Sequence, residues 1–373
     1  MRVAYLTLFR FTESNGKYGR MNDVFDTLEE VNSPFDYQVF PLIGDENDLV
    51  LSNFGFEATD IFGSRWHNIE AIASSKRVLK DILHYKPDVL HVGGVSRVEL
   101  VLTGIISSVL DIPVVLGPNI GGWYPMRRTK FWSGDTKKKI SNWSNYLETM
   151  MTLRLNDPER VLAFSEYHKL MIRSVWDKNK IDVLYPAVHN RFHPDESIKR
   201  EIDILYVGNL SEQKGYFTFV DVLEKLDNQY SLKVDIVGGY PEESPPYETI
   251  DVEYHGFQPR DKLPQIYNRA KLFVCLSSDE MGPNTLIEAL SCGTPALVND
   301  EPGLNEYLQD GNGILCDRTD LNDVVTNFEA ALENQDQLLQ SAADSAECYN
   351  ISNTISQIYE IYSEVLDSCP ESD

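Results

Sequence analysis

The sequence predicts an α/β protein with two domains, each built on a parallel sheet. Short apolar runs, such as VAYLTLF and DVLHVGG early in the chain and DILYVGN and LFVCLS later, alternate with amphipathic stretches of helix length. Buried parallel strands are near-continuous apolar runs, and the connections between such strands contain helices. A chain of 373 residues is long enough for two cores of ordinary size. Near residues 188–201, a polar segment containing Pro194 separates the two halves.

The expected strands follow one another in two groups. Those of the first group are residues 3–9, 36–43, 88–94, 113–118 and 160–164, and those of the second are 203–209, 233–239, 252–257, 272–277 and 295–299. Amphipathic stretches at 66–85 and 216–226 are expected to form crossover helices. The domains are then residues 1–190 and 201–350, and residues 351–373 form a C-terminal helix and tail that pack back on the first domain.

Function is expected in the loops after the strands, because ligands of open parallel sheets bind beyond the carboxyl ends of the strands. After the first strand the chain reads LFRFTESNGKYGR and lacks the GxGxxG fingerprint of dinucleotide-binding domains, which disfavours a dehydrogenase. Gly16 and Gly19 in this loop are compatible with a turn that faces phosphate and equally with an ordinary surface loop.

The most informative segment is CLSSDEMGPNTLIEALSCG, in which Glu280 and Glu288 flank the start of an expected short helix. Pro283 stands where a first helical residue would be and Gly293 where the helix should stop, which predicts a helix over residues 284–292. The first amide groups of a helix lack intrahelical partners. Together with the helix dipole they form an anion site suited to a diphosphate.

Carboxylates around such a helix suit a nucleoside diphosphate sugar. Eight helical residues span about 12 Å, and ribose and hexose hydroxyls are donors that an ionised carboxylate accepts in pairs. Glutamates beside a helix start are also common as caps and solvated charges, and the residues alone leave that alternative open.

The order of these motifs resembles family 4 of the retaining glycosyltransferases, which have the GT-B fold (glycosyl transferases group 1). The resemblance rests on two glutamates with seven residues between them, followed by ALSCGTPALV and GLNEYLQDGNG. Pro283 and Asn284 match the PN of the family's EGxPN variant, although here the glycine follows Met281. VHNRFHP is similar to the family's VDxxRFxP, with His189 in place of the aspartate.

The resemblance implies two Rossmann-like domains with parallel sheets that face each other across a cleft, the first for the acceptor and the second for the donor. It also implies an enzyme, a hexosyltransferase that moves a hexose from a nucleoside diphosphate sugar to a growing glycan with retention of configuration. A lipid-linked or cell-surface glycan is the expected acceptor. No cofactor and no metal are expected, because no DxD or HExxH follows a strand and GT-B enzymes neutralise phosphate with amides and cations.

By matched positions, the catalytic residues are expected to be Lys214, at the diphosphate, and Glu280, at the hydroxyls of the donor sugar. Glu288 is expected to bind ribose. The donor-binding set is Gly16, Asn209, Gly282, Pro283, Asn284, Thr285 and Glu288, and Asn119 and Glu306 are further candidates. Without the family context, a lysine at a loop tip such as Lys214 is more typical of a solvated charge. Glu306 is equally compatible with a cap or a solvated charge near a short helix. Because both site glutamates are placed on a loop or a helix edge, alanine at either is expected to lower donor affinity or turnover with folding intact.

Two departures from the family pattern bear on activity. The family's GR, a few residues, then KG is GNLSEQKG here, so Asn209 stands where an arginine would add charge at the diphosphate. The loop NIGGWYP lacks the histidine that many relatives place near the donor sugar, and Asn119 with the amides around Gly121 and Gly122 is the alternative. A front-face transfer needs no base, because the departing phosphate oxygen takes the acceptor proton. Three histidines beside apolar stretches are expected to be structural: His91, His168 and His255.

A basic, aromatic-rich stretch is a candidate surface for the acceptor or for an anionic membrane. Its members are Trp123, Arg127, Arg128, Lys130, Trp132, Lys137, Lys138 and Lys139. Basic side chains with interleaved tryptophan suit anionic head groups. A solvated loop with a buried aromatic anchor is the alternative. Because no uninterrupted apolar run of about 20 residues is present, the expected location is the cytoplasm, with peripheral contact at the inner face of the membrane.

The net charge of −25 argues against a nucleic-acid partner, because phosphate backbones bind basic surfaces. The same acidity predicts a halophilic protein, since high salt screens the self-repulsion of a strongly acidic surface. Two alternatives to a transferase stay open. A non-catalytic subunit that binds nucleotide sugars is favoured by Asn209 and the missing histidine, whereas a GT-B sugar-nucleotide epimerase is disfavoured by the glutamate spacing.

Overall fold

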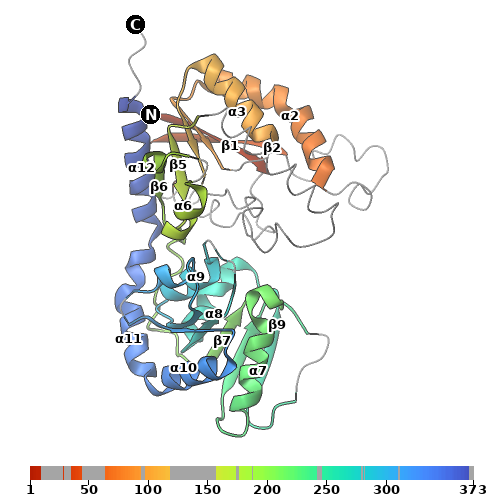
Figure 1. Cartoon of the computed structure of the whole chain (residues 1–373), viewed down its shortest axis with the longest axis vertical. Helices are drawn as coiled ribbons and strands as arrows, with labels where there is room; N and C mark the ends of the chain where they lie inside the picture. Colours follow the sequence, from red (N-terminus) through yellow and green to blue (C-terminus); the bar gives the residue numbers. More distant parts are fainter. Residues whose placement is uncertain are drawn as a thin grey trace. The chain divides into compact units, whose positions relative to one another are not determined.

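The computed structural model describes residues 1–9, 28, 35–43, 64–93, 97–117, 157–173, 176–186, 188–241, 246–278, 280, 282–309 and 311–368. They form two compact units (Figure 1). Described residues up to Leu184 and from Ser356 onward form the first unit, and those of Tyr185–Ile355 form the second. The division after Leu184 lies a few residues before the polar segment that predicted a boundary.

Six parallel strands form the sheet of the first unit, in the order β2-β1-β3-β4-β5-β6. They are β1 (Arg2–Phe9), β2 (Asp36–Ile43), β3 (Val89–Val92), β4 (Val114–Leu116), β5 (Arg160–Ala163) and β6 (Ile181–Val183). The first five coincide with the apolar runs of the sequence, and β6 is not among them. Every residue of β3 and β4 is buried, as expected for parallel strands with both faces covered.

The described part of the first unit includes helices that pack on this sheet, namely α2 (Ser64–Tyr85), α3 (Arg97–Leu110) and α6 (Glu166–Ile172). Ile82 of α2 and Ile106 of α3 are fully buried in one core with Leu90 of β3. The last helix, α12 (Ile351–Ser368), belongs to this unit from Ser356 onward. Its Tyr362 hydroxyl lies 2.5 Å from Nδ1 of His91 on β3, so this part of α12 packs on the first sheet.

The second unit has its own sheet of six parallel strands, in the order β12-β11-β10-β7-β8-β9. They are β7 (Ile204–Val207), β8 (Lys233–Val237), β9 (Asp251–Gly256), β10 (Phe273–Cys275), β11 (Ala296–Asn299) and β12 (Gly313–Cys316). The strand order runs outward from β7 and β10 in opposite directions. Loops after these two neighbouring strands therefore open at the same edge, where ligands of such sheets bind.

Helices cover both faces of the second sheet. They are α7 (Tyr216–Leu226), α8 (Leu263–Arg269), α9 (Asn284–Ser291), α10 (Leu321–Glu333) and α11 (Gln335–Ser345). Successive side chains of a strand point to opposite faces, and on β7 Tyr206 joins a core with Phe219 of α7 while Leu205 joins a second core with Leu290 of α9. The expected two α/β units with parallel sheets are thus present. Among the described residues, no helix is both long and apolar enough to span a bilayer.

Candidate active site

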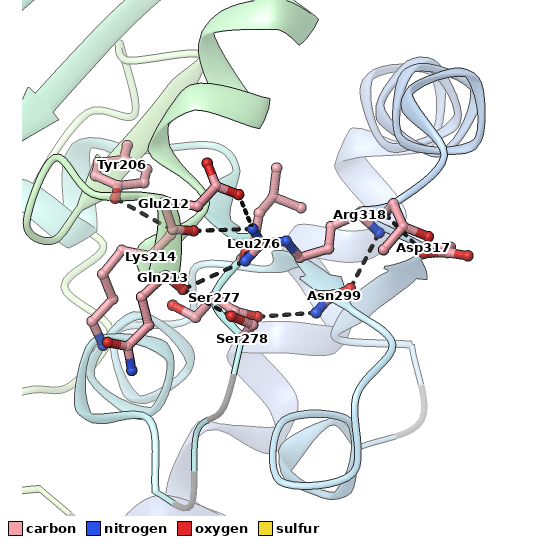
Figure 2. Close-up of polar contacts among 11 residues, drawn as sticks. Tyr206, Glu212, Gln213, Lys214, Leu276, Ser277, Ser278, Asn299, Asp317 and Arg318 are labelled. Carbon is pink, nitrogen blue, oxygen red and sulfur yellow. Dashed lines mark hydrogen bonds and ion pairs between the residues drawn. The ribbon is translucent and has the colours of Figure 1, made fainter. Parts of the chain in front are cut away.

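Lys214 ends a tight turn that follows the inner strand β7. The turn is the 3-10 helix η5 (Glu212–Lys214), and Gly215 then leads into α7. Gly215 has φ +72°, and a Cβ atom there would lie 2.2 Å from the carbonyl oxygen of Leu276, so glycine permits this close approach to the end of β10. On the β7 side, the hydroxyl of Tyr206 donates to the carbonyl of Asn209 at 2.9 Å and lies 3.4 Å from the carbonyl oxygen of Lys214 (Figure 2).

The second part of the site is the turn between β10 and α9. Pro283 is the N-cap of α9 and so precedes the first helical residue. Gly293 follows the helix with φ +66°, as its predicted role in ending the helix requires. The helix predicted over residues 284–292 is present as Asn284–Ser291. Its first turn follows β10 after residues 276–283, at the carboxyl edge of the sheet, where helix N-termini form anion sites.

The two residues predicted to be catalytic meet across these turns. The ammonium Nζ of Lys214 forms an ion pair with Oε1 of Glu280. The lysine side chain is 35% exposed and the glutamate side chain 14%, so the pair is partly shielded but open to a ligand on the lysine side. A cation and a carboxylate are therefore held together at the edge of the sheet where α9 begins.

Glu288 lies inside α9 and is only 4% exposed. Its Oε1 accepts from Arg260 at 3.1 Å and its Oε2 accepts from the hydroxyl of Tyr267 at 3.0 Å. Burial, together with the neighbouring Glu288 carboxylate, raises the pKa of Tyr267 well above its usual value, so the phenol remains a donor. The expectation that Glu288 lies on a helix edge is wrong, because its side chain points into packed structure between α8 and α9.

Sequence reasoning did not single out Arg260 or Tyr267. Arg260 lies in the 3-10 turn η6 (Arg260–Lys262), after β9, and Tyr267 lies on α8. The available signal was position: a cationic residue shortly after the VEYHGF strand lies at the carboxyl edge of the sheet, where ligands bind.

The other predicted donor residues of the second unit surround the same turns. Asn209 is exposed, and its backbone carbonyl accepts from Tyr206 at 2.9 Å. Gly282 and the N-cap Pro283 lead into α9, and Asn284 and Thr285 are its first two residues. Oδ1 of Asn284 is buried without a hydrogen-bond partner among the described residues. Glu306 lies in the 3-10 turn η7 (Asn305–Tyr307), beside the buried Tyr307.

Several predictions concern residues outside the described part of the chain. These are Gly16, Asn119, and the patch of Trp123, Arg127, Arg128, Lys130, Trp132, Lys137, Lys138 and Lys139. The acceptor and membrane predictions rest on those residues and keep the status of predictions.

The three histidines that were expected to be structural make internal contacts. His91 bonds the Tyr362 hydroxyl and the carbonyl oxygen of Gly117, and burial lowers its pKa to about 4. Burial likewise lowers the pKa of His168 to about 4, and its Nδ1 accepts from the Phe164 amide. Each ring is therefore neutral in the folded protein near pH 7.

His255 belongs to a small polar group on β8 and β9. Its Nε2 lies 2.9 Å from Oδ2 of the buried Asp235. With Glu253, these residues place one side-chain atom each within 4.8 Å of one another, close enough to surround a metal ion. Here His255 is instead engaged with Asp235, and the group lies on different strands from the two that precede Lys214 and Glu280.

Comparison with known proteins gives a family match over the part of the chain that contains these turns. Residues 189–347 match the model of the family described as Glycosyl transferases group 1. An uncharacterized 41.2 kDa protein in the cps region of Klebsiella pneumoniae is 26% identical over 249 residues, which are 61% of this chain and 68% of that protein. An uncharacterized glycosyltransferase of Haemophilus influenzae is 28% identical over 212 residues, 53% of this chain and 60% of that protein, so the match spans less than two thirds of that relative.

Solved structures share the fold along nearly the whole chain. Sucrose-phosphate synthase from Thermosynechococcus elongatus has a TM-score of 0.72 at 14% identity, covering 99% of this chain and 100% of that one. Anabaena HepE in complex with UDP-glucose has a TM-score of 0.66 at 15% identity, covering 98% and 100%. At such identities the likeness shows the fold, which is GT-B, as predicted. The family model and the relatives support placement in group 1 and, with it, glycosyltransferase function.

Proposed function

We propose that the chain is a retaining hexosyltransferase that uses a nucleoside diphosphate sugar as donor and a growing glycan as acceptor. The contact between Lys214 and Glu280 at the start of α9 carries this proposal. It puts a cation for the leaving diphosphate beside a carboxylate for sugar hydroxyls, at an edge where a helix N-terminus attracts anions. The family match over residues 189–347 supports the same assignment.

The proposed reaction breaks the bond between the anomeric carbon and the diphosphate oxygen, and forms the new glycosidic bond on the same face of the sugar. The acceptor hydroxyl gives its proton to the departing phosphate oxygen, so no side-chain base is needed. Lys214 and the first amides of α9 stabilise the negative charge that grows on the diphosphate. Glu280 accepts hydrogen bonds from donor-sugar hydroxyls and holds the hexose over the leaving group.

Within this proposal, Glu288 serves the ribose and also organises its own surroundings. Each carboxylate oxygen has two acceptor positions, and the contacts to Arg260 and Tyr267 use one on each. A UDP sugar is the first donor to test, because a structural neighbour was solved in complex with UDP-glucose.

The acceptor is proposed to be a lipid-linked or cell-surface glycan, reached at the inner face of the cell membrane. The basic, aromatic-rich stretch from Trp123 to Lys139 supports this part of the proposal. Flotation with anionic liposomes tests it. Binding that is lost when Lys137, Lys138 and Lys139 become glutamine supports membrane contact, and equal behaviour of both proteins contradicts it.

The transferase activity is tested by incubating the protein with UDP-glucose, with and without oligosaccharide acceptors, and following UDP release. A new glycoside with the anomeric configuration of the donor, read from its proton NMR coupling constant, is the expected result. A glycoside of inverted configuration contradicts retention. An epimerised nucleotide sugar formed without acceptor identifies an epimerase instead.

A binding protein without catalysis is the second candidate, because Asn209 occupies the position where the family pattern has an arginine. Tight UDP-sugar binding with no UDP release, by protein that is well folded, would favour it.

A separate proposal, that the protein is halophilic, rests on the acidity of the chain. Stability against urea that fails to rise with KCl contradicts that proposal.

A further inference from the structure

Arg318 connects the two chain segments that carry Lys214 and Glu280. It follows β12, and its side chain is 11% exposed. Nη1 donates to the carbonyl of Leu276 at 2.9 Å, at the end of β10. Nη2 donates to the carbonyl of Glu212 at 3.0 Å, in the turn that contains Lys214 (Figure 2). One guanidinium thus holds the backbone of both segments.

The backbone of Arg318 is held in place by Asn299. The amide of Arg318 donates to Oδ1 of Asn299 at 3.2 Å, and Nδ2 of the same asparagine donates to the carbonyl of Ser277 at 3.0 Å. Asn299 is only 6% exposed. The amide of Ser278 donates to the carbonyl of Gln213 at 2.8 Å, which joins the two segments directly. Figure 2 shows these contacts as one connected network beside Lys214.

We propose that Arg318 is a positioning residue for the diphosphate site, an inference that rests on the proposed function of Lys214 and Glu280. Lys214 is two residues from Glu212, and Glu280 is four residues from Leu276. The planar fork of an arginine fixes the relative position of two carbonyl groups, which neither a lysine nor an amide of shorter reach does. A displacement of about 1 Å at a site of this kind costs about a hundredfold in rate.

Arg318 also forms an ion pair with the carboxylate of Glu212, which is distinct from its bonds to backbone carbonyls. It measures 2.7 Å, but the Glu212 side chain is 73% exposed. Exposed ion pairs contribute little. The positioning effect therefore comes from the backbone carbonyls, and Glu212→Gln serves as a control that keeps them.

Arg200 provides a matched control for the loss of a shielded arginine. Its Nη2 donates to the carbonyls of Cys292 at 3.0 Å and Gly293 at 2.9 Å, at the C-terminal end of α9. Arg200→Gln removes a comparable set of backbone contacts at the helix end opposite to the one that faces the anion. It should lower the unfolding midpoint as Arg318→Gln does, without disturbing the turn of Lys214.

The experiment measures UDP affinity by calorimetry and amide hydrogen exchange over residues 212–216, in wild type, Arg318→Gln, Glu212→Gln and Arg200→Gln. In Arg318→Gln, UDP affinity should fall about tenfold to a hundredfold, and exchange of the turn should accelerate at least about tenfold. Both controls should stay within about threefold of wild type in affinity and exchange.

Unchanged exchange of the turn in Arg318→Gln overturns the positioning role, as does a UDP affinity equal to that of Arg200→Gln. If the wild-type protein binds no UDP, that result contradicts the proposed donor and not the positioning role of Arg318. In that case the exchange measurement still decides whether Arg318 holds the turn.

Discussion

The ammonium of Lys214 forms an ion pair with the carboxylate of Glu280, although 66 residues separate them in the sequence. Lys214 follows β7 and Glu280 follows β10, which are neighbours in the second sheet. Parallel pairing brings the carboxyl ends of both strands to one edge and so brings these side chains together. The ion pair thus places a cation and a carboxylate side by side at this edge of the sheet.

Removing the cation should weaken donor binding more than folding. Lys214→Met deletes a charge-assisted bond to the diphosphate worth about 2 kcal/mol, so UDP affinity should fall about thirtyfold. Because the lysine side chain is 35% exposed, its loss should cost less than about 1 kcal/mol of unfolding free energy. Calorimetric titration and urea unfolding measure the two effects. A stability loss larger than the binding loss would assign Lys214 a structural role.

Glu280→Gln should separate sugar recognition from diphosphate binding. It keeps the size of the side chain but removes the charge that accepts sugar hydroxyls, so UDP-sugar turnover should fall about tenfold to a hundredfold. Affinity for UDP alone should stay within about threefold, since UDP lacks the hexose. The control compares the affinities of Glu280→Gln and wild type for UDP and for UDP-glucose, measured by the same titrations. An equal loss for both ligands would contradict a role at the sugar.

Glu288 should affect both stability and binding, in contrast to Glu280. Glu288→Ala removes the buried carboxylate that Arg260 and Tyr267 contact, which should cost about 3 kcal/mol of unfolding free energy. Tyr267→Phe removes one hydrogen bond and should cost about 1 kcal/mol. Urea unfolding of the two variants measures the difference. Wild-type stability in Glu288→Ala would show that the buried contacts contribute nothing net.

Asn209→Arg should raise donor affinity. The Asn209 side chain is exposed, and only its backbone carbonyl accepts the hydrogen bond from Tyr206. A larger side chain at this position therefore leaves that bond in place. An added guanidinium at the diphosphate should increase UDP affinity about tenfold. Asn209→Gln, which adds length without charge, is the control. If Asn209→Arg and Asn209→Gln bind UDP with equal affinity, the prediction that a positive charge at this position strengthens binding is wrong.

The first unit should lose stability between pH 6.5 and pH 4. His91 and His168 are buried and neutral, with pKa values lowered from 6.5 to about 4. In this range the unfolded chain binds more protons than the folded one, so the unfolding free energy falls as the pH falls. A shift of this size corresponds to about 3 kcal/mol per histidine at most. His91→Gln should flatten the dependence measured by urea unfolding at pH 7 and pH 5, and an unchanged slope would contradict the assignment.

Much of the fold followed from local pattern. The runs DVLHVGG and PVVLGP predicted β3 and β4 because buried parallel strands are continuously apolar. The helix α9 was predicted to within one residue, because Pro283 marks its start and Gly293 marks its end. The short strands β6 and β12 were missed, because three or four residues, some of them partly exposed, leave no clear apolar run.

The placement of the candidate site residues was predictable in part for the same reason. Loops after strands carry Lys214 and Glu280, and such loops can be recognised from sequence. The burial of Glu288 and its bonds to Arg260 and Tyr267 depend on how α8 packs against α9, which no local pattern encodes. Arg318 was missed as well, because its partners are backbone carbonyls more than 40 residues away.

The most direct test of the central claim is a thermal unfolding series with UDP, GDP, ADP and their hexose conjugates, in wild type and in the double variant Lys214→Met with Glu280→Gln. A ligand that binds only the folded state raises the unfolding midpoint. One nucleotide and its sugar conjugate should raise the midpoint of the wild type, and the shift should disappear in the double variant. An equal shift in both proteins, or no shift for any ligand with well-folded wild type, would contradict a nucleotide-sugar site built on Lys214 and Glu280.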